Sequence, residues 1–297
     1  MAKHLTYISV DENMRETTEH GSAAFPFEYY IDEILKFDNQ SIEWHWHTEL
    51  EWLYVEKGSI ECCAGAERIV LQEGDGLFIN SRVIHHFEER GVAVMPNILF
   101  LPSLLAAEDS AVYQEWVLPV LQSARSCFLL KRDDPAAEQV LLRLRNVFGD
   151  ADKDAQDRMQ IWLSTAELWH CFVKTFRDDL SRKGSPRDIL LQSRVRRMMQ
   201  YIQEHYGENV TLEQIAQAAN VSRSEALRCF HTQLQKTPVE YLIEFRLAKA
   251  RQLLFTTNDT VSQIASAVGM ENISYFIRAF KARYGTTPGA CRRQNLL

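Results

Sequence analysis

A short histidine-rich run near the N-terminus holds the residue types with the clearest chemistry. His45 and His47 are separated by one residue, Glu51 follows four residues later, and His85 comes 11 residues after Gly74. Side chains two residues apart on a strand point to the same face, so His45 and His47 can converge. Three imidazoles and a carboxylate can hold a divalent transition metal, hydrogen-bond a hydroxyl-rich ligand, or form a structural polar core. The sequence leaves all three open.

Short strands must position these side chains. Runs rich in β-branched and aromatic residues recur between about residues 27 and 100, and glycines at positions 58, 65, 74 and 91 separate them. This pattern predicts a small β-barrel or sandwich, in which His86, next to His85, points outward. The predicted strands are 28–34, 52–55, 68–71, 77–79 and 92–95. From about residue 104 to 180 the apolar spacing becomes helical.

Charge is divided unevenly along the chain. The 297 residues carry a net charge of −7, which by itself argues against a nucleic-acid partner. Residues 187–297, however, carry 15 Lys and Arg against 9 Asp and Glu, a balance of +6, which leaves −13 for residues 1–186. No apolar run is long enough for a membrane helix, and six sparse cysteines favour reduced thiols in a cytoplasmic protein. We therefore expect an acidic part and a basic part, with no membrane partner.

The basic part contains an internal repeat. Residues 211–216 (TLEQIA) return 49 positions later as 260–265 (TVSQIA). In both copies Thr and Gln three residues apart fit a capping box, which starts a helix. Asn220 and Gly269 stand at matching positions where a sharp turn needs left-handed backbone. Each copy is therefore expected to form a helix-turn-helix, with second helices over residues 222–235 and 272–284.

The second helix of each copy has the residue types that contact DNA. Polar side chains at its N-terminal outer face can reach base edges and phosphates, while Phe230 and Phe280 pack inward. An amphipathic helix from Pro238 to Leu254, about 26 Å long, can set the two helices roughly 34 Å apart, one DNA turn. The candidate DNA-binding residues are Arg223, Ser224, Glu225 and Arg228 in the first copy and Asn272, Ser274, Tyr275 and Arg278 in the second.

Residues 193–293 resemble the AraC/XylS DNA-binding domain. The resemblance implies two helix-turn-helix units on one monomer, entering successive major grooves of double-stranded DNA. Gln235 departs from the family pattern, because the first unit often has glycine there. The motifs that carry the resemblance include Ile215-Ala216, Ser222 to Phe230, Tyr241-Leu242, Arg246-Leu247, Ile264-Ala265, Gly269, Ser274-Tyr275-Phe276, Arg278 and Gly285.

The histidine run resembles the first cupin motif, HxHxxxExxxxxxG, and the segment from Gly74 to His85 resembles the second. A cupin-like domain is the usual N-terminal partner of this DNA-binding domain. In many regulators that this chain resembles, the histidines belong to a sugar-binding or structural pocket without a metal. The resemblance thus makes His45, His47, Glu51 and His85 candidates for an effector pocket, and the same residues are the candidate ligands of a divalent metal.

The predicted fold is an α+β multidomain chain. Its expected parts are a cupin-like β-barrel with an N-terminal arm at 1–102, a helical extension for dimerisation at 103–180, a linker at 181–188, and an all-α double helix-turn-helix domain at 189–297.

The predicted function is sequence-specific DNA binding by a transcription regulator, not an enzyme, that responds to a small-molecule effector such as a sugar. The expected partners are promoter DNA, the effector, a second copy of the chain and, as a further candidate, RNA polymerase. No cofactor is required, although a divalent metal remains open. One alternative is a metal-dependent cupin enzyme fused to a DNA-binding module. A second is a constitutive architectural protein whose first domain only dimerises.

Overall fold

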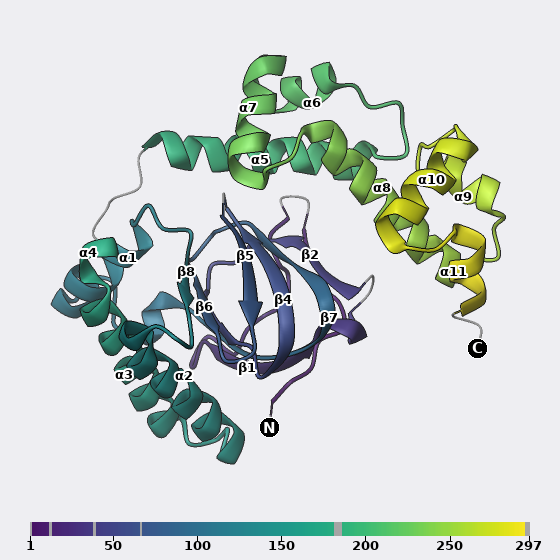
Figure 1. The fold of residues 1–297 in the computed structure, drawn as a ribbon. Coiled ribbons are helices and arrows are strands. Elements are labelled where there is room, and N and C mark those ends of the chain that lie inside the picture. The colour runs from purple at the N-terminus through teal and green to yellow at the C-terminus, as the bar shows by residue number, and fades with distance from the viewer. Residues whose placement is uncertain (1, 12–13, 38–39, 66, 181–185, 295–297) are drawn as a thin grey trace. The chain divides into compact units, whose positions relative to one another are not determined.

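The computed structural model describes residues 2–11, 14–37, 40–65, 67–180 and 186–294 (Figure 1). Contacts divide the chain into two compact units, Met1–Gln192 and Ser193–Leu297. The first unit is built on a β-sheet and the second is helical, as the sequence predicts. Within the described residues, no helix is long and apolar enough to cross a membrane.

One antiparallel sheet of eight strands forms the centre of the first unit. Its order is β5-β4-β7-β3-β6-β8, and β1 and β2 both pair with β7. The strands curve around a common interior (Figure 1). Their bounds are β1 Phe27–Glu33, β2 Ser41–His45, β3 Leu50–Tyr54, β4 Lys57–Ala64, β5 Glu67–Gln72, β6 Gly76–Ile79, β7 His85–Phe100 and β8 Cys127–Leu130.

Two glycines that predict turns lie inside strands instead. Gly58 belongs to β4 and Gly91 to β7, with φ of 80° and 106°. The β4–β7 register shifts between Gly58 and Ile60, which is the mark of a bulge. A Cβ on Gly58 would lie 1.7 Å from the carbonyl oxygen of Val92, so only glycine fits there. Because bulges bend a strand without ending it, β7 runs on where the sequence predicts a separate strand at 92–95.

The segment predicted as a helical extension shares its core with the sheet. Its main helices are α2 Pro135–Lys153 and α3 Arg158–Thr175. The ring of Phe172 on α3 lies 4.9 Å from that of Trp52 on β3 and 5.0 Å from that of Phe78 on β6. The extension also contributes β8, which pairs with β6. Its shorter helices are the 3-10 helix η3 Pro102–Leu104, the π-helix η4 Tyr113–Val117, α1 Leu118–Leu121 and α4 Arg177–Leu180.

The second unit consists of short helices around α8. Residues 181–185 of the predicted linker lie outside the described residues, and the prediction is wrong for residues 186–188, because α5 begins at Pro186. Both predicted capping boxes are confirmed, at Thr211 and Thr260. The helices are α5 Pro186–His205, α6 Leu212–Ala218, α7 Arg223–Leu234, α8 Pro238–Thr256, α9 Val261–Ala267, α10 Ile273–Tyr284 and α11 Pro288–Gln294.

The left-handed turns of the two helix-turn-helix units are also confirmed. Asn220 and Gly269 have φ of 54° and 74° between their paired helices. The ends of the second helices match as well, since Gln235 and Gly285 have φ of 53° and 71°. In the first copy, Asn220 and Gln235 thus have the left-handed backbone conformation that glycine adopts at the lowest energetic cost.

Candidate histidine site and DNA-reading helices

Strand pairing brings the predicted histidines together. β2 ends at His45 and β7 begins at His85, and these two residues are partners in the antiparallel β2–β7 register. His47 follows in the connection to β3. One ring nitrogen from each of the three histidines lies within 4.8 Å of the other two, and all three side chains are buried.

Backbone carbonyls fix the orientation of these rings. The Nδ1 atoms of His45, His47 and His85 lie 2.8, 3.2 and 3.0 Å from carbonyl oxygens two residues away. A carbonyl oxygen can only accept, so each Nδ1 carries a proton and donates it. The Nε2 atoms are left to face the shared space. A second ring nitrogen fixed in this way is typical of histidines that bind a metal.

Glu51 on β3 completes the predicted set. Its Oε2 lies 3.4 Å from Nε2 of His47 and 3.1 Å from Nε2 of His85. Burial raises the pKa of Glu51, but these two contacts outweigh it and hold that pKa well below its usual range. Burial, together with the neighbouring His85, lowers the pKa of His45 to about 3. The site therefore combines an ionised carboxylate with at least one neutral imidazole.

The N-terminal arm, which is the segment before β1, adds two residues that the sequence did not indicate. Oε2 of Glu16 lies 3.2 Å from Nε2 of His20 and 3.9 Å from Nε2 of His45. Nδ1 of His20 lies 3.0 Å from the hydroxyl of Tyr30 on β1. Although burial raises the pKa of Glu16, its hydrogen bond with His20 and the nearby imidazoles lower it to about 2. Nothing in the spacing of residues in this arm could have identified them.

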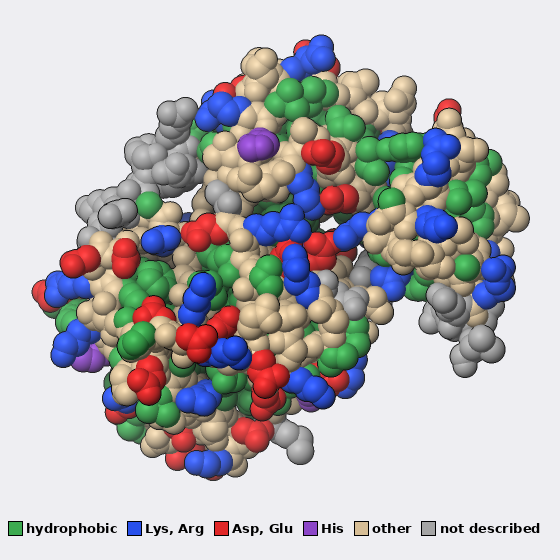
Figure 2. Space-filling view, in the orientation of Figure 1, with side chains coloured by type: hydrophobic (Ala, Val, Ile, Leu, Met, Phe, Trp, Pro, Cys, Tyr) green, Lys and Arg blue, Asp and Glu red, His purple; other side chains and the backbone are tan. Residues whose placement is uncertain are grey.

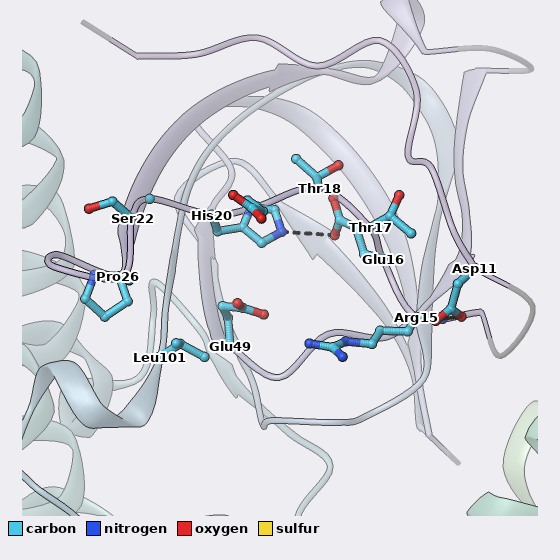
Figure 3. Close-up of a pocket in the computed structure, with 13 residues that line it drawn as sticks. Asp11, Arg15, Glu16, Thr17, Thr18, His20, Ser22, Pro26, Glu49 and Leu101 are labelled. Carbon is cyan, nitrogen blue, oxygen red and sulfur yellow. Dashed lines mark hydrogen bonds and ion pairs between the residues drawn. The ribbon is translucent and has the colours of Figure 1, made fainter.

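A cavity of about 490 Å³ lies beside these arm residues (Figure 3). Glu16 and His20 form part of its wall, whereas the four predicted pocket residues are not among its lining residues. The predicted pocket is thus a buried cluster, and the neighbouring space is bounded mainly by the arm. The lining residues are Asp11, Arg15, Glu16, Thr17, Thr18, Glu19, His20, Gly21, Ser22, Ala23, Pro26, Glu49 and Leu101.

His86 follows His85 on β7, where the sequence predicts an outward-pointing side chain, and it is buried. Only 6% of the residue is exposed, because the ring of Trp44 packs on it with 4.1 Å between ring centroids. Alternation along β7 does direct His86 away from His85, but the tryptophan covers it.

In the first helix-turn-helix unit, a carboxylate holds two arginines. Ser222 caps α7 by accepting a hydrogen bond from the backbone N–H of Glu225. The Glu225 carboxylate does not fold back to the cap; instead it accepts hydrogen bonds from Arg228 at 2.6 and 2.8 Å and from Arg194 at 2.9 Å. The bonds from Arg228 lower the pKa of Glu225 to about 2. Arg223 and Ser224 are exposed beside this group.

The second unit presents its polar residues with less internal pairing. Asn272 caps α10 by accepting a hydrogen bond from the N–H of Tyr275. Ser274, Tyr275 and Arg278 are exposed on the same helix. Arg278 has no ion pair with any residue that the structure describes. The matching arginines therefore differ, since Arg228 is bound to Glu225 and Arg278 is available.

The two units also differ in surface charge. On the face drawn in Figure 2, Lys and Arg side chains are spread over the part of the second unit around α9 and α10. Over the first unit, acidic and basic side chains are mixed. A surface rich in Lys and Arg attracts the DNA backbone.

Comparisons with known proteins match both units. A helix-turn-helix domain model matches residues 215–294, and a cupin domain model matches residues 36–98. An uncharacterised HTH-type transcriptional regulator of Bacillus subtilis, YdeC, is 29% identical over 96% of this chain and 98% of its own length.

Solved structures match the second unit. The C-terminal domain of AraT, a response regulator from Geobacillus stearothermophilus, is 36% identical, and the match covers 34% of this chain and 84% of that one, with a TM-score of 0.33. The DNA-binding domain of AdpA, solved with a target DNA, is 26% identical over 34% of this chain and 90% of its own, with a TM-score of 0.33. From the two domain matches and the full-length relative, this chain is similar to HTH-type transcriptional regulators, and a segment that matches the cupin domain model precedes the segment that matches the helix-turn-helix domain model.

Proposed function

We infer that this regulator responds to a small, hydroxyl-rich molecule such as a sugar. The observation that carries this proposal is the 490 Å³ cavity, whose size is within the range of small-molecule sites. Its wall offers the hydroxyls of Thr17, Thr18 and Ser22, the carboxylate of Glu49 and the guanidinium of Arg15 (Figure 3). Mixed donors and acceptors of this kind suit a ligand with several hydroxyl groups.

The arm provides a route from ligand to response. Most of the cavity wall belongs to the arm, while Glu49 and Leu101 belong to the body of the first unit. A ligand that touches both binds more tightly when the arm is docked. By that difference in affinity it shifts the population towards the docked state. If the two states differ in their ability to bind an operator, the ligand changes transcription.

The two second helices are the proposed DNA readers. In α10, Ser274, Tyr275 and Arg278 reach base edges and phosphates, while Asn272 has its side-chain oxygen engaged by the helix cap. In α7, Arg223 and Ser224 take this role. Glu225 then serves to orient Arg228 rather than to read a base itself.

A second copy of the chain is the proposed partner of the helical extension. Met159 and Leu163 lie one turn apart on α3 and are 66% and 44% exposed. Two such faces from two copies would cover each other and place two DNA-reading units on one operator. RNA polymerase is the proposed further partner, and the cytoplasm the proposed location.

The test is operator affinity of the full-length chain. Fluorescence anisotropy with DNA from upstream of its own and adjacent genes would be measured with and without a panel of sugars and other polyols. We expect one of them to change the affinity, and Thr17→Val to abolish that change while ligand-free DNA binding stays the same. A ligand response that survives Thr17→Val and Glu49→Gln would remove the cavity from the proposal.

A metal-dependent cupin enzyme fused to a DNA reader is the second candidate. The three histidine ring nitrogens that lie within 4.8 Å of one another favour it. A panel of cupin-type turnover assays with divalent metals would test this, with His47→Ala as the variant that should lose any activity and keep DNA binding.

A further inference from the structure

Glu16 is a buried carboxylate whose partners are incomplete. Its side chain is 2% exposed, and its Oε1 has no hydrogen-bond partner among the residues that the structure describes. A buried, unpartnered carboxylate oxygen is costly unless a cation or donor reaches it. The other oxygen, Oε2, lies 3.9 Å from Nε2 of His45, one of the three converging histidines.

The histidine site and Glu16 together form a donor set for a divalent transition metal. His45, His47 and His85 present Nε2 with their Nδ1 protons engaged by backbone carbonyls. Two ionised carboxylates, Glu16 and Glu51, adjoin these nitrogens, and both residues are buried. Neutral imidazoles with carboxylates suit zinc, iron, manganese or cobalt.

Glu16 reaches this site only while the arm is docked. The N–H of Glu16 donates to the carbonyl oxygen of Trp46 at 2.9 Å, and the N–H of Trp46 donates to that of Met14 at 3.1 Å. Met14 is fully buried beside them. These bonds join the arm to the residue between His45 and His47. The position of the Glu16 carboxylate and the docking of the arm are therefore one event.

We propose that Glu16 is an arm-borne ligand of a divalent metal held by His45, His47 and His85, so that metal binding fastens the N-terminal arm over the site. This deepens the proposed function, because the arm also forms most of the wall of the effector cavity. Because coupling between two binding events is reciprocal, docking of the arm also raises the affinity of the site for the metal. The occupancy of the metal site would then determine the fraction of molecules in which the arm is docked and the effector can bind.

The experiment titrates the full-length, chelator-treated protein with Co²⁺ alone. Visible absorption and calorimetry give the stoichiometry and affinity. Hydrogen exchange reports the Glu16 amide, which bonds to Trp46. We expect one Co²⁺ per chain and slower exchange at this amide when Co²⁺ is bound. In Glu16→Gln the affinity falls about 10- to 100-fold, the spectrum changes, and Co²⁺ no longer slows the exchange. Glu56→Gln, an exposed carboxylate of the same unit, is the matched control and behaves as wild type.

Three results would overturn the proposal. The first is Co²⁺ binding by Glu16→Gln with wild-type affinity and exchange, and the second is no Co²⁺ binding by the wild type. The third is binding of Co²⁺ by His47→Ala with the same affinity as the wild type. If Glu16→Gln does not fold, Glu16→Asp keeps the charge but shortens the reach, and an unchanged Co²⁺ spectrum and affinity in that variant overturns the proposal too. Because no DNA or effector is present, failure here leaves the operator test of the proposed function intact.

Discussion

Replacing Gly269 with alanine tests how the second helix-turn-helix is built. At this residue the backbone is left-handed, with φ of 74°. A Cβ would lie 2.7 Å from the carbonyl oxygen of Tyr206 and 2.8 Å from Nη2 of Arg246. That guanidinium donates from Nε to the Tyr206 carbonyl at 2.7 Å and from Nη2 to the Glu208 carbonyl at 2.6 Å. The new methyl group would therefore clash with the Tyr206 carbonyl oxygen and with Arg246, which donates a hydrogen bond to that oxygen.

The expected cost has two parts. Left-handed backbone costs a non-glycine residue about 1–2 kcal/mol. Displacing Arg246 puts at risk two hydrogen bonds from a charged group, each contributing about 1.5–3 kcal/mol. Because part of this strain can relax, we expect Gly269→Ala to lower the free energy of unfolding of the second unit by roughly 3–5 kcal/mol.

Gly285→Ala is the matched control. Its φ is 71°, and a Cβ there would have no heavy atom within 4 Å. Gly285→Ala should therefore lower the free energy of unfolding only by the cost of left-handed backbone, about 1–2 kcal/mol. By the same reasoning, Gln235→Gly should stabilise the first copy by up to about 1 kcal/mol, because φ there is 53°.

Urea unfolding followed by two probes separates the units. All six tryptophans, at positions 44, 46, 52, 116, 162 and 169, lie in the first unit, so their fluorescence reports that unit alone. Circular dichroism reports the helices of both. Gly269→Ala should shift the helical transition of the second unit and leave the tryptophan transition in place. Equal shifts for Gly269→Ala and Gly285→Ala would refute the reasoning about the clash.

The other predictions concern DNA affinity, pH and assembly. Arg278→Ala should weaken operator binding about 10- to 100-fold and reduce the salt slope by about 1, whereas Arg228→Ala should do less because Glu225 already neutralises it; equal losses in anisotropy titrations would contradict this. Burial raises the pKa of Asp32 from 3.8 to about 7 in spite of its hydrogen bond from Asn97. The contribution of Asp32 to stability should therefore fall as pH rises from about 4 to 7, and Asp32→Asn should stabilise the first unit by up to about 4 kcal/mol at pH 8 and hardly at all at pH 4; thermal melts that show the same gain at both pH values would exclude it. Leu163→Asp should convert a dimer into a monomer in analytical ultracentrifugation without lowering the melting temperature, since 44% of the residue is exposed; an unchanged sedimentation coefficient would place the dimer contact elsewhere.

The second unit was predictable because its signals are local. A capping box needs two residues three apart, and a left-handed turn needs one residue of the right type, so Thr211, Thr260, Asn220 and Gly269 could all be identified in the sequence. The hydrogen-bond partner of the Glu225 carboxylate could not be predicted from the sequence. That carboxylate can return to the cap or pair with Arg228, and only the folded geometry decides between them.

The sheet was harder to predict because its strands depend on distant partners. From Ile60 to Ala64 β4 is buried on both faces, so it lacks the alternation that indicates a strand. β8 has four residues and exists through its pairing with β6. The four predicted residues of the histidine site could be found from their spacing. Glu16 could not, because nothing local says that the arm returns over the site.

The long strand β7 determines when the first unit can form. It pairs with β1, β2, β3 and β4, and its last residue, Phe100, lies opposite both Phe27 and Leu50. Contacts so far apart in sequence form slowly, whereas a helix-turn-helix closes between neighbours. During synthesis the sheet must wait until residue 100 has left the ribosome, and its last strand until residue 130. The part of the chain made last therefore has the faster folding topology, and the sheet should set the rate at which a nascent chain becomes a working regulator.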